Sequence, residues 1–313
     1  MAEPTLSVVM PTHNRTDQLQ RAADSVLGQG SVDLELIVVD DASDGDNGAV
    51  LERLADDQRV RVVRNPESLG PGGARNLGID LARGDFLAFC DDDDALLPGA
   101  ADALVAHLRA NPSLGAASCW HRVIHSATGR AVDYRGPLHF GAGALRWLNL
   151  VAIPFGVVRR SSHAEGLRFN PVLPPCEDWD MWLRCAERAP LEVVPLVLYE
   201  YYQHGGARVT KAGSGSRSGL GALLEAHSSS MTPACRAYHR LVLAEQSGGR
   251  SAMTGQLRTE AAASPVAAAL AASVLGCSAA LSPIGIRHAD PALAARSMHR
   301  LLVAEGQDRD RRR

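Results

Sequence analysis

The sequence has few of the features that mark nucleic-acid-binding proteins. Aromatic residues make up 4% of its 313 residues, and its net charge of −3 is close to neutral. Binding nucleic acid usually needs a broad basic face, and single strands also need aromatic platforms for stacking the bases. We therefore expect no nucleic acid among its partners.

Cysteine pairs and long apolar runs are also missing. The six cysteines lie far apart without a C-x-x-C pair, so neither a disulfide framework nor a thiolate metal site is expected. No window offers the roughly 20 uninterrupted apolar residues of a membrane-spanning helix, because serine, proline and glycine break the nearest candidate, residues 261–281. The first residues, Met-Ala-Glu-Pro, lack the basic and apolar regions of a secretory signal. We expect a soluble, reduced, cytoplasmic protein without a membrane span.

The sequence is rich in short apolar runs that alternate with amphipathic segments. Hydrophobic residues make up 46% of the chain, enough for a large core. The runs predict buried strands at residues 6–10, 34–39, 60–63 and 86–90. Helices are expected after a cap at Thr16, over 74–83 before a stop at Gly84, and from Pro98 to about 110. This alternation is typical of an α/β doubly wound sheet with helices on both faces.

Polar motifs follow the carboxyl ends of these predicted strands, which is where ligands bind in α/β sheets. The first strand precedes Pro-Thr-His-Asn-Arg at 11–15, and the second precedes Asp-Asp-Ala-Ser at 40–43. The fourth precedes Asp91 to Asp94, and Glu-Asp-Trp-Asp at 177–180 opens a later helix, expected over 179–189. We expect the motifs to meet at one edge of the sheet.

The run from Asp91 to Asp94 is the sharpest of these motifs. Four consecutive carboxylates repel one another strongly unless a cation lies among them. A divalent ion that is held by oxygen ligands and shared with a diphosphate would relieve the repulsion. The alternative is a solvated acidic turn that caps the helix at Pro98.

Taken together, these motifs resemble the family 2 inverting glycosyltransferases of GT-A fold. Residues 7–15 and 38–43 look like that family's first two strands, and 70–78, with Ala-Arg-Asn, resembles the segment before its third helix. Asp91 to Asp94 with Pro98 resembles the D-x-D metal motif, and 177–180 resembles the late E-D motif. The resemblance covers about residues 5–205, and the order and spacing of the motifs make it specific.

The resemblance implies a GT-A type sheet, mixed but mostly parallel, and a division of the chain. Residues 1–120 would be the nucleotide-sugar-binding half of the GT-A domain, and 121–210 the acceptor and catalytic half. Residues 211–313 would form a helical C-terminal extension with a polar tail, preceded by a flexible loop over 203–221. Whether the extension is an acceptor lid or a homodimer interface is left open.

The resemblance also assigns donor-binding residues. Pro11, Thr12, His13 and Asn14 would lie around the nucleotide base. Asp41 would accept a hydrogen bond from the base or ribose, and its alternative role is a helix cap. Arg75 would approach the diphosphate, and its alternative is an exposed helix arginine.

Metal and ribose ligands are implied within the acidic run. Asp93 would bind the metal directly together with Asp91, and Asp91 or Asp92 would hold the ribose, with the register open by one residue. His204 would contact the metal or the diphosphate, and its alternative is a surface histidine. The metal would be Mn²⁺ or Mg²⁺.

Asp178 matches the family's catalytic base, and its alternative role is to start a helix favourably. One carboxylate near the acceptor hydroxyl, opposite the leaving nucleotide, gives inversion at the anomeric carbon. The metal neutralises charge on the departing diphosphate.

We therefore expect sugar transfer from a nucleoside-diphosphate sugar, with UDP as the nucleotide. The acceptor would be a glycan precursor, a peptide or a specialised metabolite. Two other functions are weighed against this one: a nucleotide-sugar-binding scaffold without turnover, and a sugar-phosphate nucleotidyltransferase. The latter usually carries a glycine- and lysine-rich phosphate loop where this chain has residues 11–15.

Overall fold

The computed structural model describes residues 3–44, 48–136, 138–139, 141–147, 149, 151, 156–162, 167–171, 173, 176–203 and 215–265. The chain forms two compact units. The first comprises Met1–Gly141, Val151–Val172 and Glu177–Ala207, and the second Ala142–Leu150, Leu173–Cys176 and Arg208–Arg313. Each unit is described by itself below.

The first unit contains a nine-stranded mixed sheet with the order β3-β2-β1-β4-β8-β6-β9-β5, and β7 pairs with β6. The first four strands in this order run parallel, as do β6 and β9, whereas β8 is antiparallel to both of its neighbours. The expected mixed, mostly parallel α/β sheet is confirmed. The strands are β1 Leu6–Thr12, β2 Leu34–Asp40, β3 Val60–Arg64, β4 Phe86–Phe89, β5 Ala95–Leu96, β6 Ala116–His125, β7 Arg130–Tyr134, β8 Gly156–Arg159 and β9 Leu191–Gln203.

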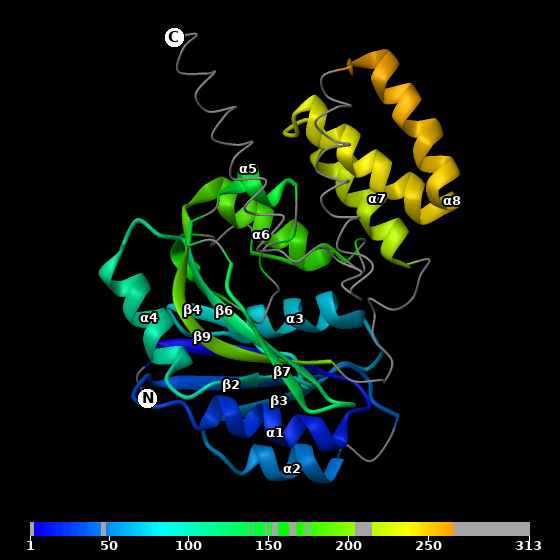
Figure 1. Cartoon of the computed structure of the whole chain (residues 1–313). Coiled ribbons are helices and arrows are strands. Elements are labelled where there is room, and N and C mark those ends of the chain that lie inside the picture. Colours follow the sequence, from blue (N-terminus) through cyan, green and yellow to red (C-terminus); the bar gives the residue numbers. More distant parts are fainter. Residues whose placement is uncertain are drawn as a thin grey trace. The chain divides into compact units, whose positions relative to one another are not determined.

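Helices cover both faces of this sheet, as expected. α1 and α2 lie on one face and α3 on the other (Figure 1). The helices of this unit are α1 Thr16–Leu27, α2 Gly48–Ala55, α3 Gly70–Leu81, α4 Ala100–Ala110 and α6 Glu177–Arg188, with a 3₁₀ turn at Arg160–Ser162.

The apolar stripe of α1 packs into the core under β1. Its four members, which the helical spacing predicts, are fully buried: Leu19, Ala22, Ala23 and Val26. The prediction that Thr16 caps the helix is wrong, because Thr16 is already its first residue. Arg15 holds the cap position without a side-chain cap bond, and its side chain reaches another partner, described below.

Helix α3 begins four residues earlier than expected and ends at Leu81. Glycine and proline at 70–73 favour a loop by propensity, but tertiary contacts outweigh that preference here. The helix lies very close to β1, because a Cβ added at Gly78 would lie 2.2 Å from Val9 Cγ1. Gly84 is not the helix stop; it is needed because a Cβ there would lie 2.7 Å from the backbone nitrogen of Ser7. Likewise α4 starts after Gly99, which has a φ of +80°, and not at Pro98.

The second unit is helical and has its own apolar cluster. Its helices are α5 Ala142–Leu145, α7 Gly215–His227 and α8 Pro233–Ala263. Residues 215–221, expected to belong to a loop, therefore begin α7. The cluster joins Trp147 to residues around and within the first half of α8: Met231, Ala234, Cys235, Ala237, Tyr238 and Leu241.

Helix α8 reverses direction within its length. Arg240 and Glu260 form an ion pair at 3.3 Å, although 20 helical residues would separate them by about 30 Å in a straight helix. Gly249, with a φ of +62°, lies between them and permits the reversal. None of the helices in the described part of the chain has the length and apolar character needed to cross a membrane.

Candidate active site at the carboxyl ends of the strands

The polar motifs that follow β1, β2 and β4 meet at one edge of the sheet, as the sequence predicts. Thr12 Oγ1 donates a hydrogen bond of 2.7 Å to Asp92 Oδ2, which joins the ends of β1 and β4. The backbone nitrogen of Asp41 donates to the carbonyl oxygen of Thr12 at 2.9 Å, which joins the ends of β1 and β2. This edge is the ligand-binding position of parallel α/β sheets.

The acidic turn, Asp91 to Asp94, is largely buried. Asp92, Asp93 and Asp94 are 7%, 9% and 0% exposed, so the alternative of a solvated turn is wrong. Carboxylate oxygens of Asp91, Asp93 and Asp94 all lie within 4.8 Å of one another. Hard oxygen ligands at this spacing fit Mg²⁺ or Mn²⁺.

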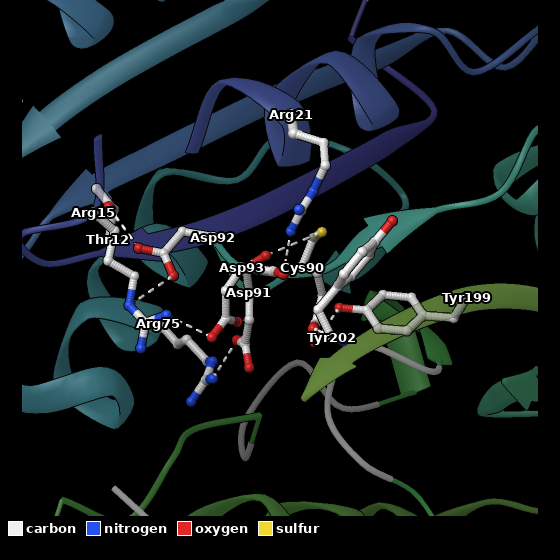
Figure 2. Close-up of polar contacts among 11 residues, drawn as sticks. Thr12, Arg15, Arg21, Arg75, Cys90, Asp91, Asp92, Asp93, Tyr199 and Tyr202 are labelled. Carbon is white, nitrogen blue, oxygen red and sulfur yellow. Dashed lines mark hydrogen bonds and ion pairs between the residues drawn. The ribbon is translucent and has the colours of Figure 1, made fainter. Parts of the chain in front are cut away.

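Within the described residues, three arginines contact this turn from different elements (Figure 2). Arg15 Nη1 donates to Asp93 Oδ2 at 2.6 Å, and Arg21 Nη2 donates to the carbonyl oxygen of Asp93 at 2.5 Å. Arg75 Nη2 donates to Asp91 Oδ1 at 2.6 Å. Repulsion among four carboxylates demands cations, but sequence reasoning assigned that role to a metal and missed Arg15 and Arg21. The signal for Arg15 was its place in the motif that follows β1.

Arg75 joins the acidic turn to the helix that carries Asp178. Its side chain is only 5% exposed, so the alternative of an exposed helix arginine is wrong, and its Nη1 lies 3.3 Å from Glu177 Oε1. Its Nε is buried without a hydrogen-bond partner among the described residues. Burial would lower the pKa of Arg75, but Asp91 and Glu177 outweigh it and raise that pKa above its ordinary value.

Asp178 lies in the first turn of α6, directly after Glu177. Its Oδ1 accepts a hydrogen bond of 2.7 Å from the backbone nitrogen of Trp179. Its charge also acts on Arg75. The structure therefore brings Asp178 into the same charged group as Asp91, although the two lie on separate segments.

Several carboxyl groups of the site hold protons more tightly than usual. Burial raises the pKa of Asp92 to about 7. Burial, followed by the charge of Asp178, raises the pKa of Glu177 to about 6. The pKa of Asp94 is also raised well above its usual range, first by burial and then by Asp91 and Asp93. Such shifts are frequent where a fold keeps carboxylates for binding or catalysis.

Asp94 attaches the end of β9 to the acidic turn. Its Oδ2 accepts a hydrogen bond of 3.0 Å from the hydroxyl of Tyr199, and its Oδ1 accepts one of 2.9 Å from the backbone nitrogen of Tyr202. The guanidinium of Arg21 lies 3.8 Å from the centre of the Tyr202 ring. Sequence reasoning missed these partners because the contact spans 105 residues and has no local pattern.

Asp41 is almost fully engaged by the segment that leads into α3. Its Oδ1 accepts hydrogen bonds from Asn65 Nδ2 and the backbone nitrogen of Leu69. Its Oδ2 accepts from Ser68 Oγ and the backbone nitrogen of Gly70. Asp41 thus caps α3 from a neighbouring segment, which is the alternative role that the sequence left open. Its contact with a nucleotide stays a prediction.

The segment after β1 places its polar side chains at the surface of this edge. Pro11 and Thr12 are buried in β1, whereas His13 and Asn14 are exposed. His13 Nδ1 donates to the carbonyl oxygen of Asp41 at 2.8 Å, and Asn14 Oδ1 accepts from the backbone nitrogen of Asp44 at 2.9 Å. His204 lies outside the described residues.

Comparisons with known proteins agree with this geometry. The model of glycosyl transferase family 2 matches residues 7–166. A Campylobacter jejuni GalNAc(5)-diNAcBac-PP-undecaprenol beta-1,3-glucosyltransferase is 44% identical over 104 residues, which are 33% of this chain and 34% of the relative. The chondroitin synthase of Escherichia coli is 27% identical over 205 residues, 64% of this chain and 29% of the relative. The chain thus spans about a third of the length of these curated relatives.

Solved structures show the same fold. Staphylococcus aureus TarS 1-349 in complex with UDP-GlcNAc matches with a TM-score of 0.65 at 18% identity, over 93% of this chain and 89% of that one. The mannosyltransferase PcManGT of Pyrobaculum calidifontis, in complex with GDP-Man and Mn²⁺, matches with a TM-score of 0.59 at 20% identity, over 96% and 88%. The sheet and its helices are therefore of the GT-A type.

Proposed function

The chain belongs to glycosyl transferase family 2, and from that premise we propose that it transfers a sugar from a nucleoside-diphosphate sugar to an acceptor hydroxyl, with inversion at the anomeric carbon. The observation that carries the proposal is the buried bridge from Asp91 through Arg75 to Glu177. It joins the acidic turn to the start of α6, where Asp178 lies, and this supports a shared reaction site.

In this proposal Asp178 is the general base. A carboxylate within hydrogen-bond reach of the acceptor hydroxyl removes its proton as the oxygen attacks the anomeric carbon. Glu177 does not replace it, because its carboxylate is engaged by Arg75. A single base on the side opposite the leaving nucleotide gives one displacement and therefore inversion.

Asp91 and Asp93 would hold Mn²⁺ or Mg²⁺, since both offer carboxylate oxygens at this edge. The bound ion would neutralise the charge that develops on the departing diphosphate. Asp94 is the third member of the group, but hydrogen bonds from Tyr199 and Tyr202 already engage both of its oxygens. We therefore assign it a supporting role.

The donor would lie along the ends of β1 and β2. Pro11, Thr12, His13 and Asn14 would line the side of the base together with Asp41. Of the two candidates for the ribose we favour Asp92, because Asp91 is assigned to the metal and is contacted by Arg75. We propose UDP as the nucleotide, which agrees with the UDP-GlcNAc complex of the structural neighbour.

A glycan precursor is the acceptor that we propose. Two of the similar proteins carry names that describe glycan synthesis, a glucosyltransferase for an undecaprenol-linked glycan and a chondroitin synthase. This favours a sugar hydroxyl over the peptide and the specialised metabolite that the sequence leaves open.

The test is release of nucleoside diphosphate by the purified full chain. UDP-glucose, UDP-GlcNAc, UDP-galactose and GDP-mannose would each be supplied with oligosaccharide acceptors, with Mn²⁺ and again with EDTA. We expect release from one UDP-sugar that needs both the acceptor and the metal. A scaffold would bind a donor without release under any of these conditions, and that result would overturn the proposal.

Three further expectations from the sequence stay predictions. They are the cytoplasmic location, the contact of His204 with the metal or diphosphate, and the role of the second unit as an acceptor lid or homodimer interface. Size-exclusion chromatography with light scattering, on the full chain with and without donor, would test for the dimer.

A further inference from the structure

We propose that Arg15 is the internal counterion of Asp93, and that a divalent cation must displace its guanidinium in order to bind the acidic turn. This inference rests on the proposed function, because it concerns the metal that the function requires. It assigns a role to Arg15, the last residue of the motif that follows β1, to which the sequence analysis gave no separate role.

The Arg15 guanidinium lies at the carboxylate that the metal would use. Its Nη1 is 2.6 Å from Asp93 Oδ2, and its Nε is 3.7 Å from Asp92 Oδ1. A charge-assisted hydrogen bond of this length is among the stronger polar contacts in proteins. A cation that takes the same carboxylate oxygen of Asp93 therefore competes directly with Arg15.

The pair is only partly exposed, which makes the competition measurable. The side chains of Arg15 and Asp93 are 23% and 13% exposed. Ion pairs fully in solvent contribute almost nothing, because water screens them. At this depth the attraction is stronger, yet the guanidinium still has a route to solvent when it leaves Asp93.

The other two arginines at the turn are unsuited to this role. Arg21 donates to the carbonyl oxygen of Asp93 and lies over the ring of Tyr202, so it does not occupy the carboxylate. Arg75 is held on two sides, by Asp91 and Glu177, and its side chain is 5% exposed. Arg15 stands at the N-cap position of α1, and its side chain makes no capping hydrogen bond there.

Displacement of Arg15 makes the binding of the metal and the binding of the donor depend on each other. Without a nucleotide, the cation must break the pair between Arg15 and Asp93 and leave a guanidinium without that partner. With a nucleoside diphosphate bound at the same edge, the phosphate oxygens offer the guanidinium a new acceptor. Each ligand then strengthens the binding of the other by the same factor.

The experiment measures Mn²⁺ binding to the full chain by calorimetry, and by electron paramagnetic resonance of free Mn²⁺, with and without UDP. Arg15→Gln is compared with wild type and with Arg21→Gln, which removes the same charge next to the same residue but leaves the carboxylate pair intact. We expect Arg15→Gln to bind Mn²⁺ without UDP about 10-fold more tightly than wild type. Arg21→Gln should change that affinity by about twofold or less.

The coupling gives a second readout that a merely structural role would not move. In wild type, UDP should strengthen Mn²⁺ binding, and in Arg15→Gln this strengthening should be smaller. If Arg15→Gln does not fold, Arg15→Lys replaces it in the experiment, because lysine keeps the charge but loses the two-point contact with Asp92 and Asp93. The Mn²⁺ affinity of Arg15→Lys should lie between those of wild type and Arg15→Gln.

Three results would overturn the inference. Arg15→Gln could bind Mn²⁺ no more tightly than wild type, or Arg21→Gln could tighten binding equally, which would mean that net charge alone decides. In both cases the proposed function survives, provided that wild type binds Mn²⁺ with UDP. If wild type binds UDP but no Mn²⁺ at all, the metal-dependent function fails and the inference fails with it.

Discussion

The two ends of the parallel strands use the same residue types for different purposes. At the amino ends, Glu35 is buried, and its carboxylate accepts hydrogen bonds from Ser7 Oγ at 2.6 Å and from Arg83 Nη2 at 2.7 Å. The backbone nitrogen and Nε of Arg83 also donate to it. One carboxylate thus receives a complete set of donors. At the carboxyl ends, Arg15 lies at the carboxylates of Asp92 and Asp93, and Arg75 is divided between Asp91 and Glu177.

The pKa values of Glu35 and Asp92 differ in the way that these surroundings predict. Burial would raise the pKa of Glu35, but the hydrogen bonds from Ser7 and Arg83 outweigh it and lower that pKa. At the other end, burial outweighs the bond from Thr12 and the charge of Arg15, and raises the pKa of Asp92 to about 7. The first arrangement stabilises the fold. The second buries carboxyl groups without enough donors to stabilise their charged form, which is typical of functional sites.

The largest effect is expected at the carboxyl ends, from Asp178→Asn. Removing the general base should reduce turnover by about 100-fold or more, because proton abstraction contributes that factor. The affinity for UDP should stay within about twofold of wild type, since the substitution preserves shape and leaves the acidic turn intact. Steady-state kinetics and calorimetry check the two parts. Unchanged turnover would remove Asp178 from the mechanism.

Next comes the bridge between the acidic turn and α6. Arg75→Lys keeps the charge, but an ammonium cannot reach Asp91 and Glu177 together in the fork geometry of a guanidinium. Turnover should fall by about 10- to 100-fold, the range for residues that orient a catalytic group. The matched control is Arg83→Lys at the amino ends, which should lower the unfolding midpoint and leave kcat unchanged. Equal kinetic losses in both variants would contradict the contrast between the two ends.

For the free energy of unfolding, we expect the larger loss from a substitution at the amino ends of the strands. Glu35→Gln should lower the free energy of unfolding by about 2 kcal/mol, the usual contribution of hydrogen bonds to a charged group. Asp93→Asn should lower it by less than about 1 kcal/mol, because its partner Arg15 is partly exposed. Denaturant unfolding of both variants measures the difference. A larger loss in Asp93→Asn would show that the acidic turn is a stabilising element after all.

The smallest expected effect is a difference in pH dependence. The folded-state pKa of Asp92 is raised to about 7 from 3.8, so the folded chain holds this proton more tightly than the unfolded chain. Its contribution to stability is full below the unfolded pKa and is lost as the pH rises through about 7. Asp92→Asn should therefore gain about 1 kcal/mol relative to wild type between about pH 6 and about pH 8.

The comparison must be made against wild type at each pH. Burial lowers the pKa of His121 and of His239 to about 4, and these groups destabilise the fold as the pH falls, in both proteins alike. At the amino ends the sign is opposite to that of Asp92. The lowered pKa of Glu35 gives stability that is present above its unfolded pKa and lost in acid, so Glu35→Gln should lose its disadvantage only at low pH.

Much of the fold could be predicted because its signals are local. Near-continuous apolar runs identify β1, β2 and β4 as strands buried on both faces. The spacing of Leu19, Ala22, Ala23 and Val26 identifies the buried side of α1. Since parallel strands end at one edge, the sequence also predicted that Asp41 and the acidic turn lie at the same edge of the sheet, where Thr12 connects them.

What could not be predicted depends on contacts between distant segments. The start of α3 at Gly70 is stabilised by Asp41, whose carboxylate accepts hydrogen bonds from the backbone nitrogens of Leu69 and Gly70. Local helix propensity does not predict this contact, because the two segments are far apart in the sequence. The attachment of Asp94 to Tyr199 and Tyr202 is equally non-local. Arg15 and Arg21 were missed because electrostatic repulsion demands a cation without saying which one.

The close packing of α3 against β1 has a consequence for the position of Arg75. Gly78 lies one helical turn beyond Arg75, and its missing side chain is what lets the helix rest against Val9. A single methyl group there would lift the helix away from the strand and carry the guanidinium out of register with both of its acidic neighbours. The position of Arg75 between Asp91 and Glu177 thus depends partly on the missing side chain of Gly78.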